Sequence, residues 1–246
     1  MITFLSPAKQ MRPYEAPNLA LSRPQFLQEA EELSGLLKAL SPWQLESLMK
    51  VSPKLGQEVF FMTQAFSAHA PGSPALFTYH GLQYQHIAPA EFTPEDLAFA
   101  QVHLAILSGL YGLVRPLDGI SPYRLEMGCP LDTGKGDLYH YWGDKLAQAL
   151  TQTGEVLLNL ASKEYSKAVL PHLAGRSRCI TCDFLTYKGG KYKTLATWAK
   201  MARGEMTRYI MQNRIDDPKA LWDFSWEGFS YAPHRSNEET YVFIQG

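Results

Sequence analysis

The run from Phe99 to Gly128 constrains the fold of this chain more than any other segment. Its first part has apolar side chains at helical spacing up to Leu107, which predicts a helix that ends at Ser108-Gly109. The residues that follow have little periodicity, and fixed turns are predicted at Gly109, Gly112, Pro116, Gly119 and Pro122. A long loop of fixed shape commonly holds a site. The alternative is a packed connection whose charged groups satisfy buried backbone atoms.

The composition predicts one domain. With 246 residues, of which 46% are hydrophobic, the chain is long enough to bury a substantial core. We expect residues 1–246 to form a single domain with a helical sub-region at 22–67, because no linker clearly divides the chain. The first residues, MITFLSPAK, predict a short buried strand and a turn rather than a signal peptide, so we expect a cytoplasmic protein. No segment approaches the length of a membrane span.

The cysteines predict neither a disulfide framework nor a metal site. Their odd number, three, agrees with a reducing environment. Cys179 and Cys182 form a CxxC, but the segment around them predicts a strand, in which positions three apart point to opposite faces. A redox CxxC needs a turn that opens a helix, and a zinc site needs a second pair of ligands. We therefore expect a structural role for both cysteines, and no metal or other cofactor.

Positive charge is concentrated in one part of the chain. The formal net charge of the whole is −1, yet residues 159–214 contain eleven Lys and Arg against three Asp and Glu, a net charge of +8. Such a segment can present a basic face or cleft to an anionic partner. The alternative is a scatter of these charges over the solvated surface. We expect them to lie on one face.

Cap residues and hydrophobic periodicity predict a mixed α/β fold. Helices are expected from Ser22 to Leu40, after Ser41-Pro42 and Ser52-Pro53, from Thr93, from Asp137 to about Thr151, after Ser162, over about Trp198–Arg214 and after Asp217. Strands are expected at Ala75–Tyr79, Leu82–Ile87, Val156–Ala161, Phe224–Tyr231 and Thr240–Ile244, with a Gly-Gly hairpin at Tyr187–Tyr192. The order predicts a mixed sheet flanked by helices, without the regular alternation of a doubly wound fold.

Residues 40–66 predict two short helices joined by a Lys50–Gly56 turn, which is the layout of a helix–hairpin–helix DNA-binding unit. Such a hairpin directs backbone N–H groups and a helix N-terminus at one phosphate, and a nearby lysine adds charge. The expected contacts are Lys54 and the amides of Leu55, Gly56 and Gln57. An ordinary αα-hairpin remains the alternative, because only one of the two usual glycines is present.

Two further segments place polar groups where the sites of α/β proteins commonly lie. Ser6-Pro7-Ala8-Lys9 follows the first strand, and Asn159 to Tyr165 leads from a buried strand into a helix N-terminus. Ordinary capping and turn chemistry is the alternative for both. The chain has no phosphate loop and no GxGxxG, HExxH or GxSxG motif, and His80 and His86 lack a carboxylate at useful spacing.

Several of these segments together resemble the YaaA peroxide-stress family of bacteria. The resemblance is carried, in this order, by SPAK, SGLYGLVRPLDGISPYRLEMG, LYHYWGD, NLASKEY, KMARGEMTRYIMQNRI and FSWEGFSY. It implies the "cantaloupe" α/β fold with a positively charged cleft and a helix–hairpin–helix element. It also implies double-stranded or branched DNA as the ligand, and a role in limiting peroxide damage that is linked to intracellular iron. The chain departs from the family pattern with His80 and Leu82, where the family has lysine and aspartate.

The leading hypothesis is a sequence-nonspecific DNA-binding protein that acts in the response to peroxide stress. Its expected phosphate contacts are Lys50, Lys54, Gly56, Gln57, Lys163, Lys167, Lys200, Arg203 and Arg208. The expected cleft is lined by Tyr111, Arg115, Arg124, Asn159 and Ser162.

The rival hypothesis is an enzyme that acts on a phosphorylated or nucleotide-like small molecule in a cleft lined by the 108–128 loop. Its acid–base candidates are Ser6, Lys9, Tyr84, Asp118, Glu126 and Glu164. Convergence of these side chains in an enclosed pocket favours the enzyme, whereas an open basic groove past the hairpin favours DNA. An iron-binding protein is a weaker third hypothesis, since no cluster has ligand spacing. The oligomeric state is not predicted.

Overall fold

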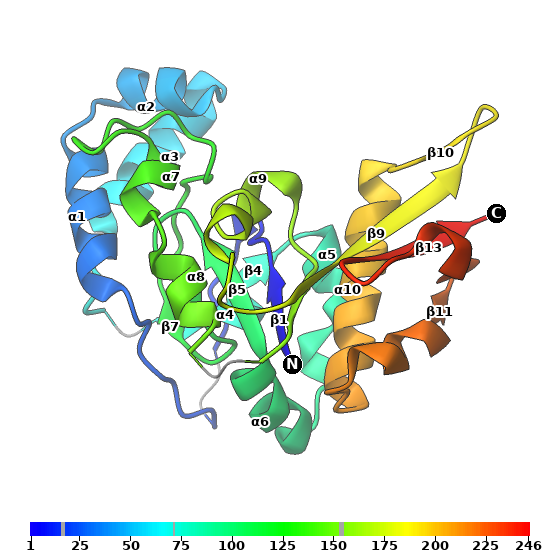
Figure 1. Ribbon diagram of the computed structural model, residues 1–246. Coiled ribbons are helices and arrows are strands. Elements are labelled where there is room, and N and C mark those ends of the chain that lie inside the picture. The colour runs from blue at the N-terminus through cyan, green and yellow to red at the C-terminus, as the bar shows by residue number, and fades with distance from the viewer. Residues whose placement is uncertain (16–17, 71, 153–154) are drawn as a thin grey trace.

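The computed structural model describes residues 1–15, 18–70, 72–152 and 155–246 and is built on one large sheet (Figure 1). Its strands follow the order β11 (Ser225–Trp226), β12 (Phe229–Tyr231), β13 (Thr240–Gln245), β9 (Cys179–Tyr187), β8 (Leu157–Asn159), β1 (Ile2–Leu5), β5 (Leu104–Ser108) and β6 (Gly112–Val114). The strands from β13 to β5 run parallel, and the outer strands are antiparallel. The predicted mixed α/β fold is confirmed.

The centre of the sheet is buried on both faces. Every residue of β1, β5 and β8 is buried, as expected where helices cover both sides of parallel strands. The helix α6 (Pro94–His103) packs against β1 and β5, and α10 (Ala196–Gln212) packs against β9. Phe4 of β1 is in register with Asn159 of β8, so the carboxyl ends of these two strands lie side by side. This edge positions the functional groups described below.

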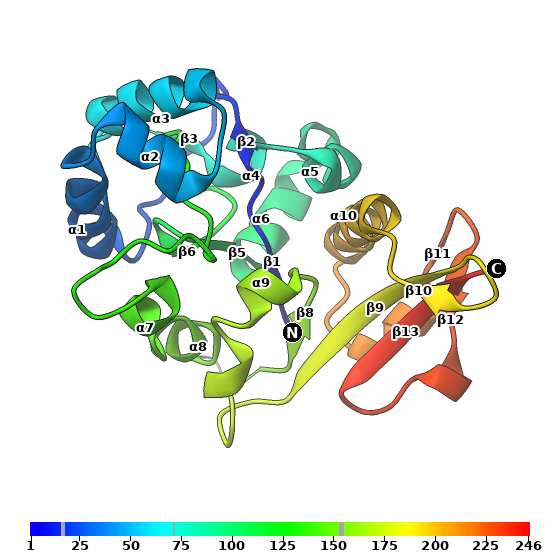
Figure 2. The same ribbon diagram turned by 90° about the horizontal axis from the view of Figure 1, so that it is seen from above.

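Three helices form a lobe at one end of the molecule: α1 (Leu27–Lys38), α2 (Pro42–Met49) and α3 (Pro53–Ala65). Figures 1 and 2 show this lobe on the opposite side of β1 from β9 and β13. The predicted starts of α2 and α3 are confirmed, because Ser41 and Gln44 form a capping box and Ser52 accepts the Leu55 N–H. Buried side chains of the lobe belong to the same hydrophobic core as those of the sheet.

The remaining elements are short. Two-residue strands pair β2 (Gln10–Met11) with β4 (Tyr79–His80) and β3 (Ser73–Pro74) with β7 (Gly119–Ile120). The short helices are α4 (Ala75–Thr78), α5 (Leu82–Ile87), α7 (Leu138–Trp142), α8 (Lys145–Leu150) and α9 (Lys163–Ser166). Short 3₁₀ segments lie at Pro89–Glu91, Leu170–His172, Pro218–Asp223 and Pro233–Arg235.

Two predicted strands are wrong, because residues 75–78 and 82–87 form the helices α4 and α5. In α5 the buried residues are Gln83, Tyr84 and Ile87, which is helical rather than alternating spacing. Only Tyr79 and His80, between the two helices, are extended, and they pair with β2. Short apolar segments of this length do not distinguish strand from helix by periodicity alone.

Two helix boundaries also differ from prediction. The helix α6 ends at His103, and residues 104–108 form the buried strand β5 rather than the end of a helix. Every side chain of β5 is buried, so an uninterrupted apolar run imitates the apolar face of a helix. Ser22 does not cap α1, which begins at Leu27. It forms an isolated β-bridge with Asp118 instead.

The C-terminal half follows the prediction closely. Residues 187 and 192 pair across the Gly-Gly turn as β9 and β10 (Tyr192–Lys193), α10 covers most of the predicted helix, and the last predicted strand is present as β13. The predicted strand Phe224–Tyr231 is interrupted by a turn at Glu227-Gly228 and forms the antiparallel pair β11 and β12 instead. Cys179 and Cys182 both lie on β9, Cys182 fully buried, and burial raises the pKa of each thiol. A structural role agrees with this placement.

Candidate functional site

A cavity of about 410 Å³ opens where the chain leaves the carboxyl ends of β1 and β8. We call it the strand-end cavity. Its walls come from the segment after β1 (residues 6–10), from α5 and the two residues before it, from the loop at 123–126, from the start of α9 and from α10. Sites at this edge are typical of parallel sheets. Its volume falls in the range of small-molecule sites, about 300–1,000 Å³.

Ser6 and Ser162 join the two strand ends. The Ser162 N–H donates to Ser6 Oγ at 2.8 Å, and Ser6 Oγ donates to Ser162 Oγ at 3.1 Å. Ser6 is buried, and its carbonyl oxygen accepts the Tyr84 hydroxyl at 2.9 Å. Ser162 precedes α9 without capping it through its side chain. These contacts hold the β1 and β8 ends together and tie α5 to them.

Glu126 organises the cations of the 123–126 loop. Its Oε1 lies 3.0 Å from Arg124 Nη2 and 3.0 Å from Lys9 Nζ. The Glu126 and Arg124 side chains are largely buried, whereas Lys9 is 67% exposed at the mouth of the cavity. Glu164 Oε1 accepts the Gly128 N–H at 2.9 Å and is thereby fixed beside the same loop. The two carboxylates therefore position their neighbours as well as lining the cavity.

Three buried nitrogen atoms of cavity-lining residues have no hydrogen-bond acceptor among the described residues. They are Nε of Arg124, Nε of Arg203 and Nε2 of Gln83. Burial lowers the pKa of Arg203, although the charge of Asp183 favours its protonated form. Unpaired buried donors are rare in folded proteins because each costs about 1–3 kcal/mol. All three belong to side chains that line the cavity, although the nitrogen atoms themselves are closed off from solvent.

Tyrosines form the inner wall of the strand-end cavity. The Tyr123 hydroxyl lies 2.7 Å from Ser108 Oγ and 2.8 Å from the Tyr79 hydroxyl, so the wall is connected to the end of β5. Burial raises the pKa of Tyr84, Tyr123 and Tyr165 well above its ordinary value. These phenols are therefore neutral at physiological pH and do not serve as bases there.

Some predicted site residues lie elsewhere. Asp118 accepts Ser22 Oγ and the Arg115 N–H, the Tyr111 hydroxyl accepts the Ser121 N–H, and Asn159 Oδ1 accepts the Ala161 N–H. These groups hold turns together, as the alternative of ordinary turn chemistry predicts. Arg115 and Asp118 border a separate cavity of about 200 Å³.

The cavity also contains residues that the sequence analysis missed or assigned to another role. His80, Gln83, Tyr123 and Tyr165 line it, and so do Lys200 and Arg203, which were expected to contact DNA. Gln83 was missed because its segment was predicted as a strand. If residues 82–87 are instead interpreted as a helix, Gln83 and Tyr84 lie on its buried face. This helical spacing is the sequence signal that identifies them.

The basic residues of 159–214 do not gather on one face, and that prediction is wrong. Arg176, Arg208 and Arg214 pair with Asp144, Glu91 and Asp96 respectively, and Arg178 donates to the Glu238 carbonyl oxygen. Lys167 lies over the ring of Tyr139. The turn between β9 and β10 and the helix α6, which holds Asp96, are far apart in Figure 1. Among the eleven, only Lys200 and Arg203 line the cavity.

The α2–α3 hairpin has exposed cations at its turn. Lys50 adopts a left-handed conformation with φ 52°, and Lys50, Lys54 and Gln57 are exposed. Gly56 is buried against α2, where an added Cβ would lie 2.8 Å from Glu46 Cβ. The Leu55 and Gly56 amides already donate to Ser52. The expected phosphate contacts through these two amides are therefore corrected, while the lysine side chains are free to make such contacts.

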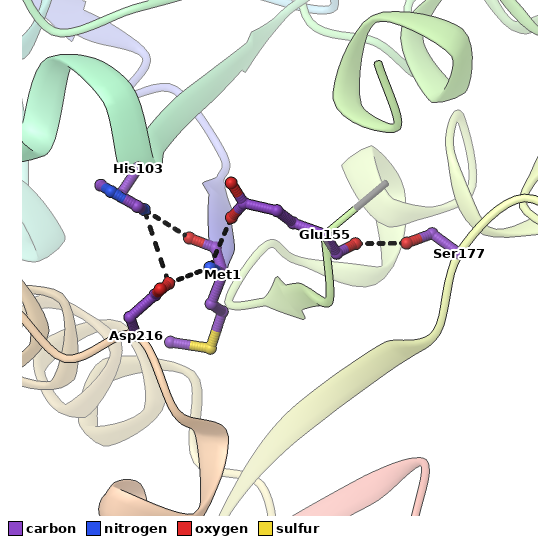
Figure 3. A network of polar contacts seen from close by, with 5 residues as sticks. All are labelled: Met1, His103, Glu155, Ser177 and Asp216. Atoms are coloured by element: carbon purple, nitrogen blue, oxygen red, sulfur yellow. Dashed lines mark hydrogen bonds and ion pairs between the residues drawn. The ribbon is translucent and has the colours of Figure 1, made fainter. Parts of the chain in front are cut away.

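A second polar cluster lies at the opposite end of β1 from Ser6 (Figure 3). Ligand atoms of His103, Glu155 and Asp216 lie within 4.8 Å of one another, a proximity that sequence spacing did not predict. The ammonium group of Met1 pairs with Glu155 and Asp216, and His103 Nδ1 lies 2.9 Å from the Met1 carbonyl oxygen. Through these contacts, the cluster fixes the position of the start of β1.

Comparison with known proteins finds similar sequences over nearly the whole chain. A family model described as "Peroxide stress protein YaaA" matches residues 1–235. This chain belongs to the YaaA peroxide-stress family. A UPF0246 protein of Lactiplantibacillus plantarum is similar, with 39% identity over 99% of each chain. A UPF0246 protein of Burkholderia lata is 42% identical over 99% of this chain and 98% of its own.

Membership of the YaaA family confirms the resemblance found in the sequence. The strand-end cavity is built largely from the segments that carried it, namely SPAK, the 108–128 loop, NLASKEY and the start of KMARGEMTRYIMQNRI. The described part of this YaaA-family chain contains no helix with the length and apolar character that a bilayer crossing requires.

Proposed function

We propose that this YaaA-family protein acts in the peroxide-stress response by binding a small anionic ligand in the strand-end cavity. The observation that carries the proposal is the cavity's pair of cations, Lys200 and Arg203, which have no ion-pair partner within 4.0 Å among the described residues. Acid–base groups from the rival hypothesis, Ser6, Lys9, Tyr84, Glu126 and Glu164, line the same cavity. Their convergence in a cavity too small for a duplex favours a small-molecule site.

Anions should therefore stabilise the protein through Lys200. At matched ionic strength, inorganic phosphate and malonate are expected to raise the melting temperature of the wild type above that in chloride. The shift should shrink in Lys200→Gln and persist in Lys219→Gln, which removes an exposed lysine outside the cavity. Differential scanning fluorimetry measures both. Equal shifts in all three proteins, or none, would contradict the proposal.

Nonspecific DNA binding is the second function that we propose, and the exposed Lys50 and Lys54 at the α2–α3 turn support it. Neither lysine has an acid within 4.0 Å among the residues that the structure describes. Two packed helices with exposed lysines at their turn suit contact with a phosphate backbone. Because the arginines of residues 159–214 are dispersed, we expect DNA to contact the hairpin and the exposed lysines at α9.

Reversing charge at the hairpin tests this second proposal. Lys54→Glu is expected to weaken binding to duplex and junction DNA several-fold, whereas Lys219→Glu should have little effect. Each neutralised phosphate should contribute about 0.9 to the slope of log affinity against log salt. Fluorescence anisotropy at several salt concentrations gives affinity and slope together. An affinity that is flat with salt, or unchanged by Lys54→Glu, would exclude the hairpin as a phosphate contact.

A further inference from the structure

The lining of the strand-end cavity carries a formal net charge of +2. Four cations, Lys9, Arg124, Lys200 and Arg203, face two carboxylates, Glu126 and Glu164, with His80 counted as neutral. A cavity with an excess of two positive charges selects against neutral and cationic ligands. It matches most closely a ligand that carries two negative charges.

The carboxylates of the lining are not available to neutralise the cations of α10. Glu126 pairs with Arg124 and Lys9, and Glu164 accepts a backbone N–H from Gly128. Lys200 and Arg203 approach the cavity from α10, on the other side, and neither pairs with an acid within 4.0 Å among the described residues. Both cavity cations without an ion pair therefore belong to α10, although the charge of Asp183 acts on Arg203 from outside the lining.

The guanidinium groups of the lining also bear on the kind of anion. Arg124 of the 123–126 loop and Arg203 of α10 both line the cavity. A carboxylate offers two oxygens and one charge. A phosphomonoester offers three terminal oxygens and a charge of about −1.5 to −2 at neutral pH. Guanidinium groups are well suited to such oxygens.

We propose that the strand-end cavity binds a phosphomonoester group, with Arg203 and Lys200 as its main cationic contacts. This inference rests on the proposed small-anion function and narrows its ligand class. The group has two sources of the same chemistry: a free nucleoside or sugar monophosphate, and the terminal phosphate of a nucleic-acid strand. An internal phosphodiester carries one charge and leaves part of the cavity charge uncompensated. Tyr84, Tyr123 and Tyr165 form the wall available to the rest of the ligand.

Isothermal titration calorimetry of the full chain tests the ligand class. We expect deoxyadenosine 5′-monophosphate to bind at least about tenfold more tightly than deoxyadenosine or malonate. Arg203→Gln should weaken the monophosphate at least about tenfold, because a charged hydrogen bond is lost. Arg176→Gln is the matched control, since it removes the same charge from an exposed arginine outside the cavity. If Arg203→Gln does not fold, Lys200→Gln replaces it, because Lys200 is exposed on α10.

A second titration distinguishes the sources. A single-stranded 12-mer with a 5′-phosphate is compared with the same 12-mer ending in a 5′-hydroxyl. Tighter binding of the phosphorylated strand, with competition by the monophosphate, assigns the site to strand ends. Binding of the free monophosphate alone assigns it to small metabolites. Either result supports the phosphomonoester class.

The contrary outcomes separate this inference from the proposed function. If malonate binds as tightly as the monophosphate and loses affinity in Lys200→Gln, the cavity is a general anion site and the phosphomonoester inference is wrong. If neither anion binds, both proposals are wrong. If the monophosphate binds equally to wild type and Arg203→Gln, it binds outside the proposed contacts, and the inference is again wrong.

Discussion

Replacing Gly204 with alanine is expected to destabilise the protein by about 2–3 kcal/mol, because there is no room for the added methyl group. A Cβ at this position on α10 would lie 2.3 Å from the Gln83 carbonyl oxygen and 2.7 Å from His86 Cβ on α5. The nearer atom belongs to the backbone and does not rotate away, so α10 must move from α5. Arg203 and Lys200 would move with it, and ligand affinity should fall together with stability.

A matched glycine makes this test specific. Gly35 lies inside α1, and no atom comes within 4 Å of the place that an alanine methyl group would take. Gly35→Ala should therefore stabilise the protein by about 0.5–1 kcal/mol through helix propensity alone. Urea unfolding of both variants measures the free energies. Equal stability of Gly204→Ala and Gly35→Ala would show that α5 and α10 do not pack this closely.

Ser108→Ala is expected to cost about 3 kcal/mol, since it removes the acceptor of two buried N–H groups at about 1–3 kcal/mol each. Ser108 Oγ accepts the N–H groups of Leu110 and Tyr111, at 3.2 and 2.8 Å, and bonds to the Tyr123 hydroxyl. The residue is fully buried, so water does not replace the lost contacts. The variant should loosen the 108–128 loop where it meets the cavity wall.

Two further variants refine this expectation. Ser47→Ala, at an exposed position on α2, should not destabilise the protein and should change its stability by no more than about 0.5 kcal/mol. A double-mutant cycle with Tyr123→Phe should show a coupling free energy above about 0.5 kcal/mol, because the two side chains share a hydrogen bond. Additive effects of Ser108→Ala and Tyr123→Phe in thermal or urea unfolding would remove Ser108 from the support of the cavity wall.

Local patterns predicted the parts of the site that depend on strand ends and on one loop. The segments with Ser6 and Lys9 and with Ser162 and Glu164 were each predicted to follow a buried strand, where sites of α/β proteins commonly lie, and both line the cavity. The 108–128 loop was expected to hold a site, and its Arg124 and Glu126 do line the cavity. The same loop also contains Tyr111 and Asp118, whose hydrogen bonds hold turns, and nothing in the loop's sequence separates the two groups.

Local sequence patterns could not predict contacts between residues that are far apart in the chain. The pairing of Arg208 with Glu91 and of Arg214 with Asp96 joins residues more than a hundred positions apart, so summed charge along the chain did not reveal which cations are neutralised. Because residues 82–87 were predicted as a strand, the sequence also did not reveal that Gln83 of α5 lines the cavity. Of the eleven cations of residues 159–214, two line the cavity, and three others are paired with acids from distant segments.

The sequence by itself determined the mixed α/β class, the starts of α2, α3 and α6, the β9–β10 hairpin and the family. Each of these follows from neighbours in the chain, through apolar runs, cap residues or turn glycines, and therefore survives without knowledge of the packing. Only the tertiary structure decided which cations have an acidic partner. It also decided that Arg203 of α10 lies in the same cavity as the residues that follow β1 and β8. The physical reason is that a periodic pattern encodes which face of an element is buried, but the surface that covers this face is chosen by long-range packing.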